Sequence, residues 1–211
     1  MTKEIDGNSM RYNDGKISFS SIPPTVLFGL MNLENPPYRG IIKLAEHYNL
    51  AEMKYPNAEA GNGHYINNWV KGQYIQRFII DSMWRHLVAF KTGEMFDKDF
   101  GSHHLISFSW GCCAICHYFD NYILYKNFDD RPWVCFALNK NESNLTSLLL
   151  EIQVCDSAVD VSKLAFQLLV NSLTIYESCT DNDGISFNID VERMNKIKNN
   201  EYGIPKKAVK K

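Results

Sequence analysis

The spacing of apolar residues along the chain predicts a protein made mainly of helices. The clearest pattern lies at residues 73–91, where apolar side chains recur every three or four positions, as on one face of an amphipathic helix. A second helix is expected from its N-cap Ser102 to about Tyr125, and its later part is nearly all apolar, which is typical of a buried helix. Because Gly93 ends the first helix and a short acidic connector follows, the two helices are expected to pack antiparallel in a bundle.

Further helices are expected before this pair. Pro23 and Pro24 end an extended lead-in, and Thr25 is placed to cap a helix that stops before Asn35. Another helix is expected at about residues 40–53. The segment that follows, residues 54–72, is rich in residues that break regular structure, which predicts a long loop of the kind that often carries function.

The pattern of residues along the chain changes after residue 127. An apolar run at residues 145–154 and a helix at about residues 157–176 are expected beyond this point, but no recognisable chemistry accompanies them. We therefore predict a helical domain at residues 11–127 and a smaller C-terminal extension at residues 128–211.

Composition narrows the class of protein. The chain has 211 residues, 45% of them hydrophobic, with 12 Phe, 11 Tyr and 4 Trp, which excludes a disordered chain. Its net charge of −2 means that the chain has no overall excess of positive charge to attract a phosphate backbone, so no nucleic acid is expected as a partner. The polar first ten residues and the lack of an apolar run near 20 residues predict a cytoplasmic protein without a membrane partner.

The six cysteines are interpreted as free thiols, because a reducing cytosol disfavours a disulfide framework. Cys113, Cys116 and His117 match the C-x-x-C-H sequence of c-type haem attachment, but that modification belongs to exported proteins. A zinc site is also disfavoured, because no second C-x-x-C pair completes four ligands. We interpret these cysteines as residues of the core.

Two groups of charged or ionisable residues remain as candidates for chemistry. Arg77, Asp81 and Arg85 are spaced by four and share one helix face, where they form either an ion-pair ladder or part of a site. A dense group of oxygen and imidazole donors lies in and after the acidic connector, and it is either a divalent-metal site or a solvated loop; it consists of Glu94, Asp97, Asp99, His103 and His104.

A series of short motifs lies within about residues 15–124, in this order: Ile22-Pro23-Pro24, Lys54-Tyr55, Asn68-Trp69, Arg85-His86-Leu87, Gly93-Glu94, Asp97, Gly101, His103-His104-Leu105 and Trp110. Their order and spacing resemble the phage dATP/dGTP diphosphohydrolase N-terminal domain family, which is MazZ-like and related to MazG. The resemblance implies a MazG-like antiparallel helical bundle that cuts dGTP or dATP to a monophosphate and pyrophosphate with Mg²⁺ or Mn²⁺. It further implies a homo-oligomer and, for a phage protein, the cytoplasm of the host cell.

The resemblance also implies roles for individual residues. The metal would be held at the turn between the two antiparallel helices, where divalent cations neutralise phosphate oxygens and activate water. The implied catalytic residues are Glu94, His86 and Arg85, and the implied metal ligands are Glu94, Asp97, His103 and His104. The implied substrate-binding residues are Lys54, Lys71 and Arg77 for the phosphates, with Arg85 beside them, and Asn68 and Trp69 for the base.

The sequence departs from the family pattern at two positions. Where the family has a histidine and an asparagine, this chain has Ser107 and Gly111, which share one helical face with His104. Glycine inside a helix costs about 1 kcal/mol relative to alanine, so close packing against Gly111 is expected. Two functions stay open: a metal-dependent pyrophosphohydrolase, or a degenerate relative that binds a nucleotide or a host protein as an inhibitor or sponge. A purely structural or assembly role is a third alternative.

Overall fold

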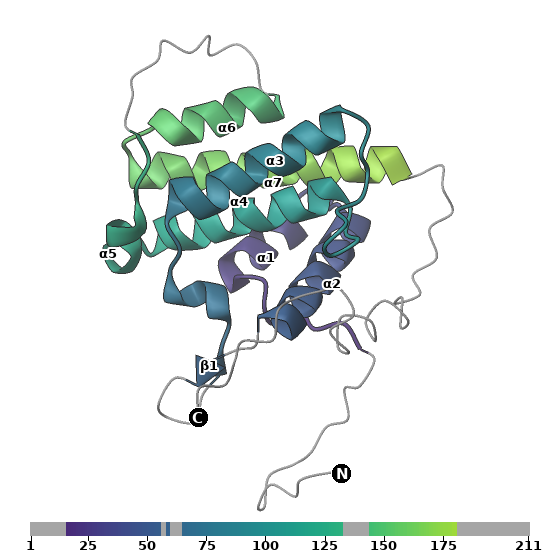
Figure 1. Cartoon of the computed structure of the whole chain (residues 1–211), viewed down its shortest axis with the longest axis horizontal. Helices are drawn as coiled ribbons and strands as arrows, with labels where there is room; N and C mark the ends of the chain where they lie inside the picture. Colours follow the sequence, from purple (N-terminus) through teal and green to yellow (C-terminus); the bar gives the residue numbers. More distant parts are fainter. Residues whose placement is uncertain (1–15, 56–57, 60–64, 133–143, 181–211) are drawn as a thin grey trace, which may run out of the picture.

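The computed structural model describes residues 16–55, 58–59, 65–132 and 144–180, which form a bundle of helices (Figure 1). Residues 11–15 of the predicted helical domain and residues 181–211 of the predicted extension lie outside the described residues. The elements in chain order are α1 Pro24–Met31, α2 Tyr38–Lys54, β1 Ala58–Glu59, β2 Tyr65–Ile66, the 3-10 helix η1 Asn68–Lys71, the π-helical segment η2 Ile75–Ile80, α3 Asp81–Lys91, α4 His104–Asp120, α5 Tyr122–Tyr125, the 3-10 turn η3 Lys126–Phe128, α6 Leu145–Val154 and α7 Ala158–Thr180. The prediction of a mainly α fold is confirmed.

Helix α4 is the centre of the bundle. Nearly all of its side chains are buried, and it packs against α7, α3 and α2. The connector between α3 and α4 joins them at one end, and the two helices lie side by side (Figure 1). They therefore run antiparallel, as the sequence predicted. The cysteines Cys112, Cys113 and Cys116 are buried in α4 as part of this core, and burial raises the pKa of each thiol.

The core continues across the boundary predicted near residue 127. Leu149 of α6 and Leu169 of α7 belong to the same buried cluster as Phe108 of α4. The hydroxyl oxygens of Ser109 in α4 and Ser172 in α7 lie 2.7 Å apart in this interface. Within the described part of the chain, α6 and α7 thus complete the bundle, so the boundary does not separate two hydrophobic cores.

Helix α7 is long and apolar enough to cross a membrane by length and composition alone. In the bundle its inward-facing side chains, such as Val161, Leu168 and Leu173, are buried against α4 and neighbouring helices. The core helix of a soluble protein passes the same length and composition test, so this is weak evidence for a membrane span.

Three helix boundaries differ from the predictions. The N-cap of α4 is His103, whose Nδ1 accepts a hydrogen bond from the Leu105 amide, while the predicted cap Ser102 is 2.9 Å from His47 Nδ1 instead. Thr25 lies inside α1 and contacts Asp120, because Pro24 already occupies the first helical position, which its ring favours. The helix predicted to run to Tyr125 breaks at Asn121, between α4 and α5.

The helix predicted at residues 73–91 begins at Ile75 as the π-helical segment η2 and continues as α3. It ends as predicted, because Gly93 adopts φ = 91°, a left-handed conformation that glycine takes without a Cβ penalty. π-helical turns inside helices are frequent at functional sites, and Phe78 of η2 lines the cavity described below.

Gly111 makes the close helix contact expected from the sequence. A Cβ atom at this position would lie 2.5 Å from Met83 Cγ and 2.7 Å from Met83 Sδ. Met83 of α3 is 1% exposed, so its side chain fills the space beside the α4 backbone. The apolar side chain of Met83 thus packs directly against the backbone at Gly111.

A double-mutant cycle tests this contact. Gly111→Ala alone gains about 1 kcal/mol of helix propensity but overpacks Met83, which costs roughly 1–3 kcal/mol. In a Met83→Ala background the clash is gone, so the same Gly111→Ala change should stabilise the protein. Urea unfolding of the four variants should give a coupling energy of about 1–3 kcal/mol. Additive effects would show that Met83 does not pack against Gly111.

Candidate functional site

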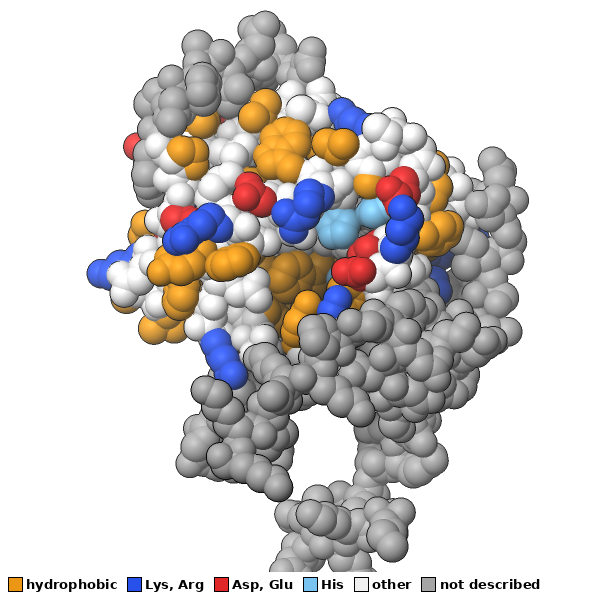
Figure 2. Space-filling view, in the orientation of Figure 1, with side chains coloured by type: hydrophobic (Ala, Val, Ile, Leu, Met, Phe, Trp, Pro, Cys, Tyr) orange, Lys and Arg blue, Asp and Glu red, His pale blue; other side chains and the backbone are white. Residues whose placement is uncertain are grey.

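A cavity of about 610 Å³ opens between α2, η1, η2 and the neighbouring faces of α3 and α4. This volume is within the range of small-molecule sites. Figure 2 shows histidine, acidic and basic side chains on this face, beside a hollow lined with hydrophobic side chains. The lining is mainly aromatic with interspersed polar groups: His47, Tyr48, Ala51, Glu52, Tyr55, Asn67, Asn68, Trp69, Gly72, Gln73, Tyr74, Phe78, Ser82, His86, Asp97, Phe100, Ser107, Trp110 and Phe128.

The short helix η1 brings Trp69 into the cavity wall. Its backbone is held by two tyrosines, since Tyr118 donates a hydrogen bond to the Trp69 carbonyl at 2.6 Å and Tyr125 donates one to the Val70 carbonyl at 2.8 Å. The Trp69 ring lies edge-on to Trp110, with ring centroids 6.4 Å apart. Burial raises the pKa of Tyr118 and of Tyr125, so both hydroxyls remain donors at neutral pH. The predicted base-binding pair Asn68 and Trp69 therefore does lie in the cavity wall.

The connector between α3 and α4 places Asp97 at the cavity. The Asp97 amide donates to the Ser102 carbonyl at 2.8 Å, and the His104 amide donates to the Met95 carbonyl at 2.9 Å. The Asp97 side chain in turn accepts a hydrogen bond from the Asp99 amide at 3.0 Å. These bonds fold the connector back on itself, so the half-buried carboxylate of Asp97 faces the cavity while Asp99 is exposed.

His86 of α3 and His104 of α4 form a pair next to Asp97. Their Nδ1 atoms are 3.0 Å apart, so one ring donates a hydrogen bond to the other. Burial lowers the pKa of His86 to about 4, with a smaller opposing effect from the Asp97 carboxylate. The His86 ring is therefore neutral at pH 7 and can accept or donate a hydrogen bond at the cavity, which it lines.

His103 lies apart from the cavity, although its neighbour is part of the histidine pair. Its Nδ1 caps α4, and its ring packs among aromatic rings, with centroids 5.7 Å from Phe90, 5.7 Å from Phe96 and 5.1 Å from Tyr176. Burial lowers the pKa of His103 to about 4. The structure thus gives His103 a packing and capping role.

The two depressed pKa values predict acid sensitivity. Each histidine binds a proton near pH 6.5 when unfolded but only near pH 4 when folded, so the unfolded state binds more protons between these values. Stability should therefore be retained above about pH 6.5 and fall toward pH 4. Linkage of the two groups gives a loss of about 2–4 kcal/mol in urea unfolding at pH 5 relative to pH 7. His103→Asn keeps an N-cap acceptor and should remove part of this loss of stability. If the pH profile of this variant equals that of the wild type, the lowered pKa of His103 is not a cause of the acid sensitivity.

The four predicted metal ligands do not gather around one point. Glu94 is exposed and lies 3.2 Å from Lys98, and His103 is held in its aromatic surroundings. Among the described residues, no three His, Cys, Asp or Glu side chains are placed to hold a metal ion together. Glu94, Asp97, His103 and His104 are therefore not placed together as a metal-binding group in this structure, and their role as metal ligands stays a prediction.

The predicted phosphate-binding cations are placed around the cavity but not in its wall. Lys54 Nζ lies 4.5 Å from the centroid of the Phe100 ring, a lining residue, and 3.6 Å from Asp99. Arg77 stacks over the Tyr74 ring at 4.1 Å and binds Asp130 at 2.8 Å, so the predicted ladder with Asp81 does not form. Neither Lys71 nor Arg85 is among the lining residues, and both are exposed.

Most of the aromatic residues that line the 610 Å³ cavity were not predicted from the sequence. Tyr48, Phe100 and Phe128 lie far apart along the chain, and each occupies an ordinary apolar position in its own segment. The one local signal was the length of the loop at residues 54–72, which forms part of the wall through η1. Tertiary packing is what brings these rings together.

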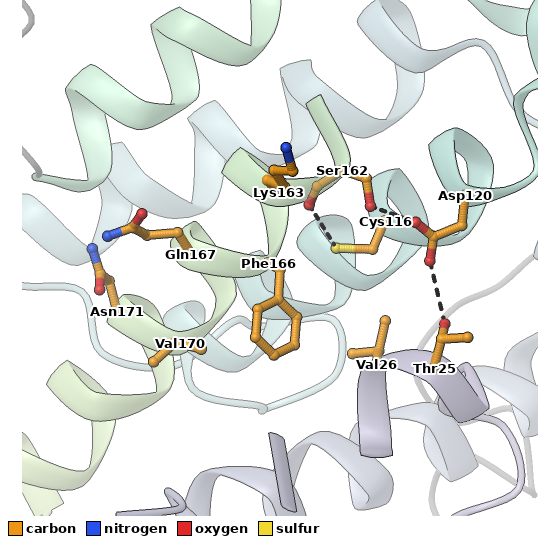
Figure 3. Close-up of a pocket in the computed structure, with 10 residues that line it drawn as sticks. All are labelled: Thr25, Val26, Cys116, Asp120, Ser162, Lys163, Phe166, Gln167, Val170 and Asn171. Carbon is orange, nitrogen blue, oxygen red and sulfur yellow. Dashed lines mark hydrogen bonds between the residues drawn. The ribbon is translucent and has the colours of Figure 1, made fainter. Parts of the chain in front are cut away.

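A second cavity of about 490 Å³ lies between α1, the end of α4 and α7 (Figure 3). Its carboxylate, Asp120, is already engaged, since one oxygen accepts a hydrogen bond from Thr25 and the other accepts one from Ser162. Lys163 on its rim is paired with Asp160 at 3.3 Å. These contacts hold α1, α4 and α7 together, so we assign this region to the fold.

Comparison with known proteins identifies a family model that matches the chain. No curated protein and no solved structure matches the chain at a significant level. A family model described as dATP/dGTP diphosphohydrolase, N-terminal, matches residues 6–131. The match covers more than half of the chain and spans every residue that lines the 610 Å³ cavity. The chain therefore belongs to the dATP/dGTP diphosphohydrolase N-terminal family.

Proposed function

We propose that this protein hydrolyses a purine deoxynucleoside triphosphate, dGTP or dATP, to the monophosphate and pyrophosphate. The observation that carries the proposal is the aromatic cavity of about 610 Å³, whose lining falls entirely within the segment matched by the family. A cavity of this size accommodates a nucleotide, and its mixture of rings and amides suits a base better than an acyl or sugar substrate.

The aromatic part of the cavity is the proposed base site. Tyr74, Phe78 and Phe128 lie next to one another in the lining and supply ring surface there, and nucleobases stack favourably on aromatic side chains. The amide side chains of Asn68 and Gln73 supply hydrogen-bond donors and acceptors in the same wall.

The proposed phosphate end is the side with His86 and Asp97. The neutral His86 ring can donate a hydrogen bond to a phosphate oxygen, and Lys54 beside Phe100 adds a cation near the rim. The lining residues themselves contain two carboxylates, Glu52 and Asp97, and no lysine or arginine. A triphosphate therefore needs further positive charge in this cavity.

The described residues do not fit a divalent ion held by the protein alone. Mg²⁺ commonly binds through one or two carboxylates plus substrate phosphates and keeps several waters, so we propose that Mg²⁺ or Mn²⁺ enters with the nucleotide. When bound, such an ion would neutralise phosphate oxygens and lower the pKa of a bound water. Asp97 is the carboxylate that we propose to face it. The catalytic roles predicted for Glu94 and Arg85 stay predictions, because both side chains lie outside the cavity lining.

A second candidate is nucleotide binding without turnover. Two observations favour it: no three potential ligands converge among the described residues, and Met83 fills the space beside Gly111. In this case the cavity would bind the nucleotide and release it without hydrolysis.

Pyrophosphate release separates the two candidates. Purified protein is incubated with dGTP or dATP and Mg²⁺ or Mn²⁺, and products are resolved by chromatography. The proposal expects the monophosphate and pyrophosphate in equal amounts. Measurable nucleotide affinity without product, with either metal, would establish the binding function instead. Absence of both affinity and product would refute the nucleotide site.

A further inference from the structure

Buried polar atoms without partners are concentrated at one cavity. Among the described residues, six buried side-chain polar atoms make no hydrogen bond, and four of them belong to residues that line the 610 Å³ cavity: Tyr48, Trp69, Ser107 and Trp110. Buried polar groups are normally paired, and leaving one unpaired costs free energy in the folded protein. Such a concentration indicates that the occupant of this cavity completes the bonding.

Three of these atoms form a coherent donor group. Ser107 and Trp110 are three residues apart on α4, so they share one face of that helix. Trp69 approaches from η1, and its ring meets Trp110 edge-on at an interplanar angle of 79°. The Tyr48 hydroxyl is set aside because it lies beside the buried thiol of Cys113.

The chemistry of the donor group restricts its ligand. An indole nitrogen can only donate a hydrogen bond, so the Trp69 and Trp110 side chains require acceptors, while the Ser107 hydroxyl can donate or accept. None of the three atoms is reached by solvent in the ligand-free structure. A ligand that enters the cavity and shifts the side chains covering these atoms would supply their hydrogen-bond partners.

We propose that Trp69, Ser107 and Trp110 are specificity-determining residues that read the acceptor edge of a purine base. This inference rests on the proposed function and adds how the base is distinguished. Guanine presents two adjacent acceptors, N7 and O6, whereas adenine presents the N7 acceptor beside an amino donor. Two donor-only indoles match guanine, and adenine would place its amino group against one of them. The wall therefore favours dGTP over dATP.

The test uses non-hydrolysable α,β-methylene analogues of dGTP and dATP with Mg²⁺, so that affinity is measured without turnover. Trp110→Phe keeps an aromatic ring but removes the N–H, and Ser107→Ala removes the hydroxyl. Each is expected to weaken binding of the dGTP analogue about 5-fold to 10-fold, as for loss of one neutral hydrogen bond. At least one of the two should weaken the dGTP analogue more than the dATP analogue, because adenine shares the N7 acceptor but lacks O6. The Tm of the ligand-free protein should stay the same or rise, because an unpaired buried group has been removed.

Trp84→Phe is the matched control. Trp84 lies in α3 outside the cavity lining, and its Nε1 donates to Gln153 at 3.3 Å. This change should lower Tm slightly and leave both affinities unchanged. If the wild-type protein binds the analogues and the cavity variants bind them equally well, the base-reading role is overturned while the nucleotide site stands. If the wild-type protein binds neither analogue, the proposed function and this inference fall together.

Discussion

Replacing Arg131 with methionine is expected to lower the free energy of unfolding by about 3–5 kcal/mol, because it leaves the buried charge of Asp129 without its partner. Both side chains of this pair are almost fully buried, at 0% and 1% exposed. The guanidinium holds both Asp129 oxygens, at 2.8 and 2.9 Å, and also donates to the Ile152 carbonyl and, at 2.9 Å, to the Cys155 carbonyl. It thereby joins the end of the α5–η3 segment to the end of α6.

The neighbouring surface pair provides the control. Arg77 and Asp130 are also 2.8 Å apart, but the Arg77 side chain is 60% exposed, and exposed ion pairs contribute only about 0–1 kcal/mol. Arg77→Met should therefore change urea unfolding little. The double variant Asp129→Leu, Arg131→Met should recover part of the loss, because neither buried charge remains. A loss below about 1 kcal/mol for Arg131→Met would contradict the role of this pair.

Asp97→Asn is expected to reduce kcat/KM for dGTP by about 100-fold or more, the effect typical of removing an ionised group that acts in the transition state. The asparagine oxygen can still accept the hydrogen bond from the Asp99 amide, so the connector should keep its fold. Pyrophosphate release over a range of dGTP concentrations measures the change, and thermal unfolding confirms that the variant is folded.

Asp99→Asn is the matched control for Asp97→Asn. It removes the same charge from the same connector, but Asp99 is 76% exposed and contacts Lys54 at 3.6 Å outside the cavity lining. Its kcat/KM should stay within about 3-fold of the wild-type value, as expected for an exposed, screened charge. Equal losses in the two variants would show that the connector acts only through its total charge. If the wild-type protein binds without turnover, the same two variants are compared by dGTP affinity.

The sequence predicted the helices with strong local patterns. The apolar face of residues 73–91, the left-handed stop at Gly93 and the apolar run that became α4 all depend on residues close together in the chain. Helix caps were less predictable, because the cap of α4 depends on whether Ser102 or His103 has another partner in the folded protein. The packing of α7 on α4 was also missed, since its apolar residues match a partner more than 40 positions away.

The candidate site, too, could be predicted from the sequence only in part. The motif residues His86, Asn68, Trp69 and Asp97 do meet at one cavity, as the resemblance implied for a shared site. The local density of acids and imidazoles predicted a metal site, but in the structure Glu94 pairs with Lys98 and His103 caps α4, so the predicted ligands are not placed together. The unpaired atoms of Ser107 and Trp110 depend on packing around α4, which spacing alone does not reveal.

A crystal structure of the protein with the α,β-methylene analogue of dGTP and Mg²⁺ tests the nucleotide site most directly. We expect the base among Trp69, Trp110 and Phe128, and the phosphates on the side of His86 and Asp97. Density for the nucleotide at another place, such as the cavity beside Asp120, or none at saturating concentration, would contradict the assignment of this cavity.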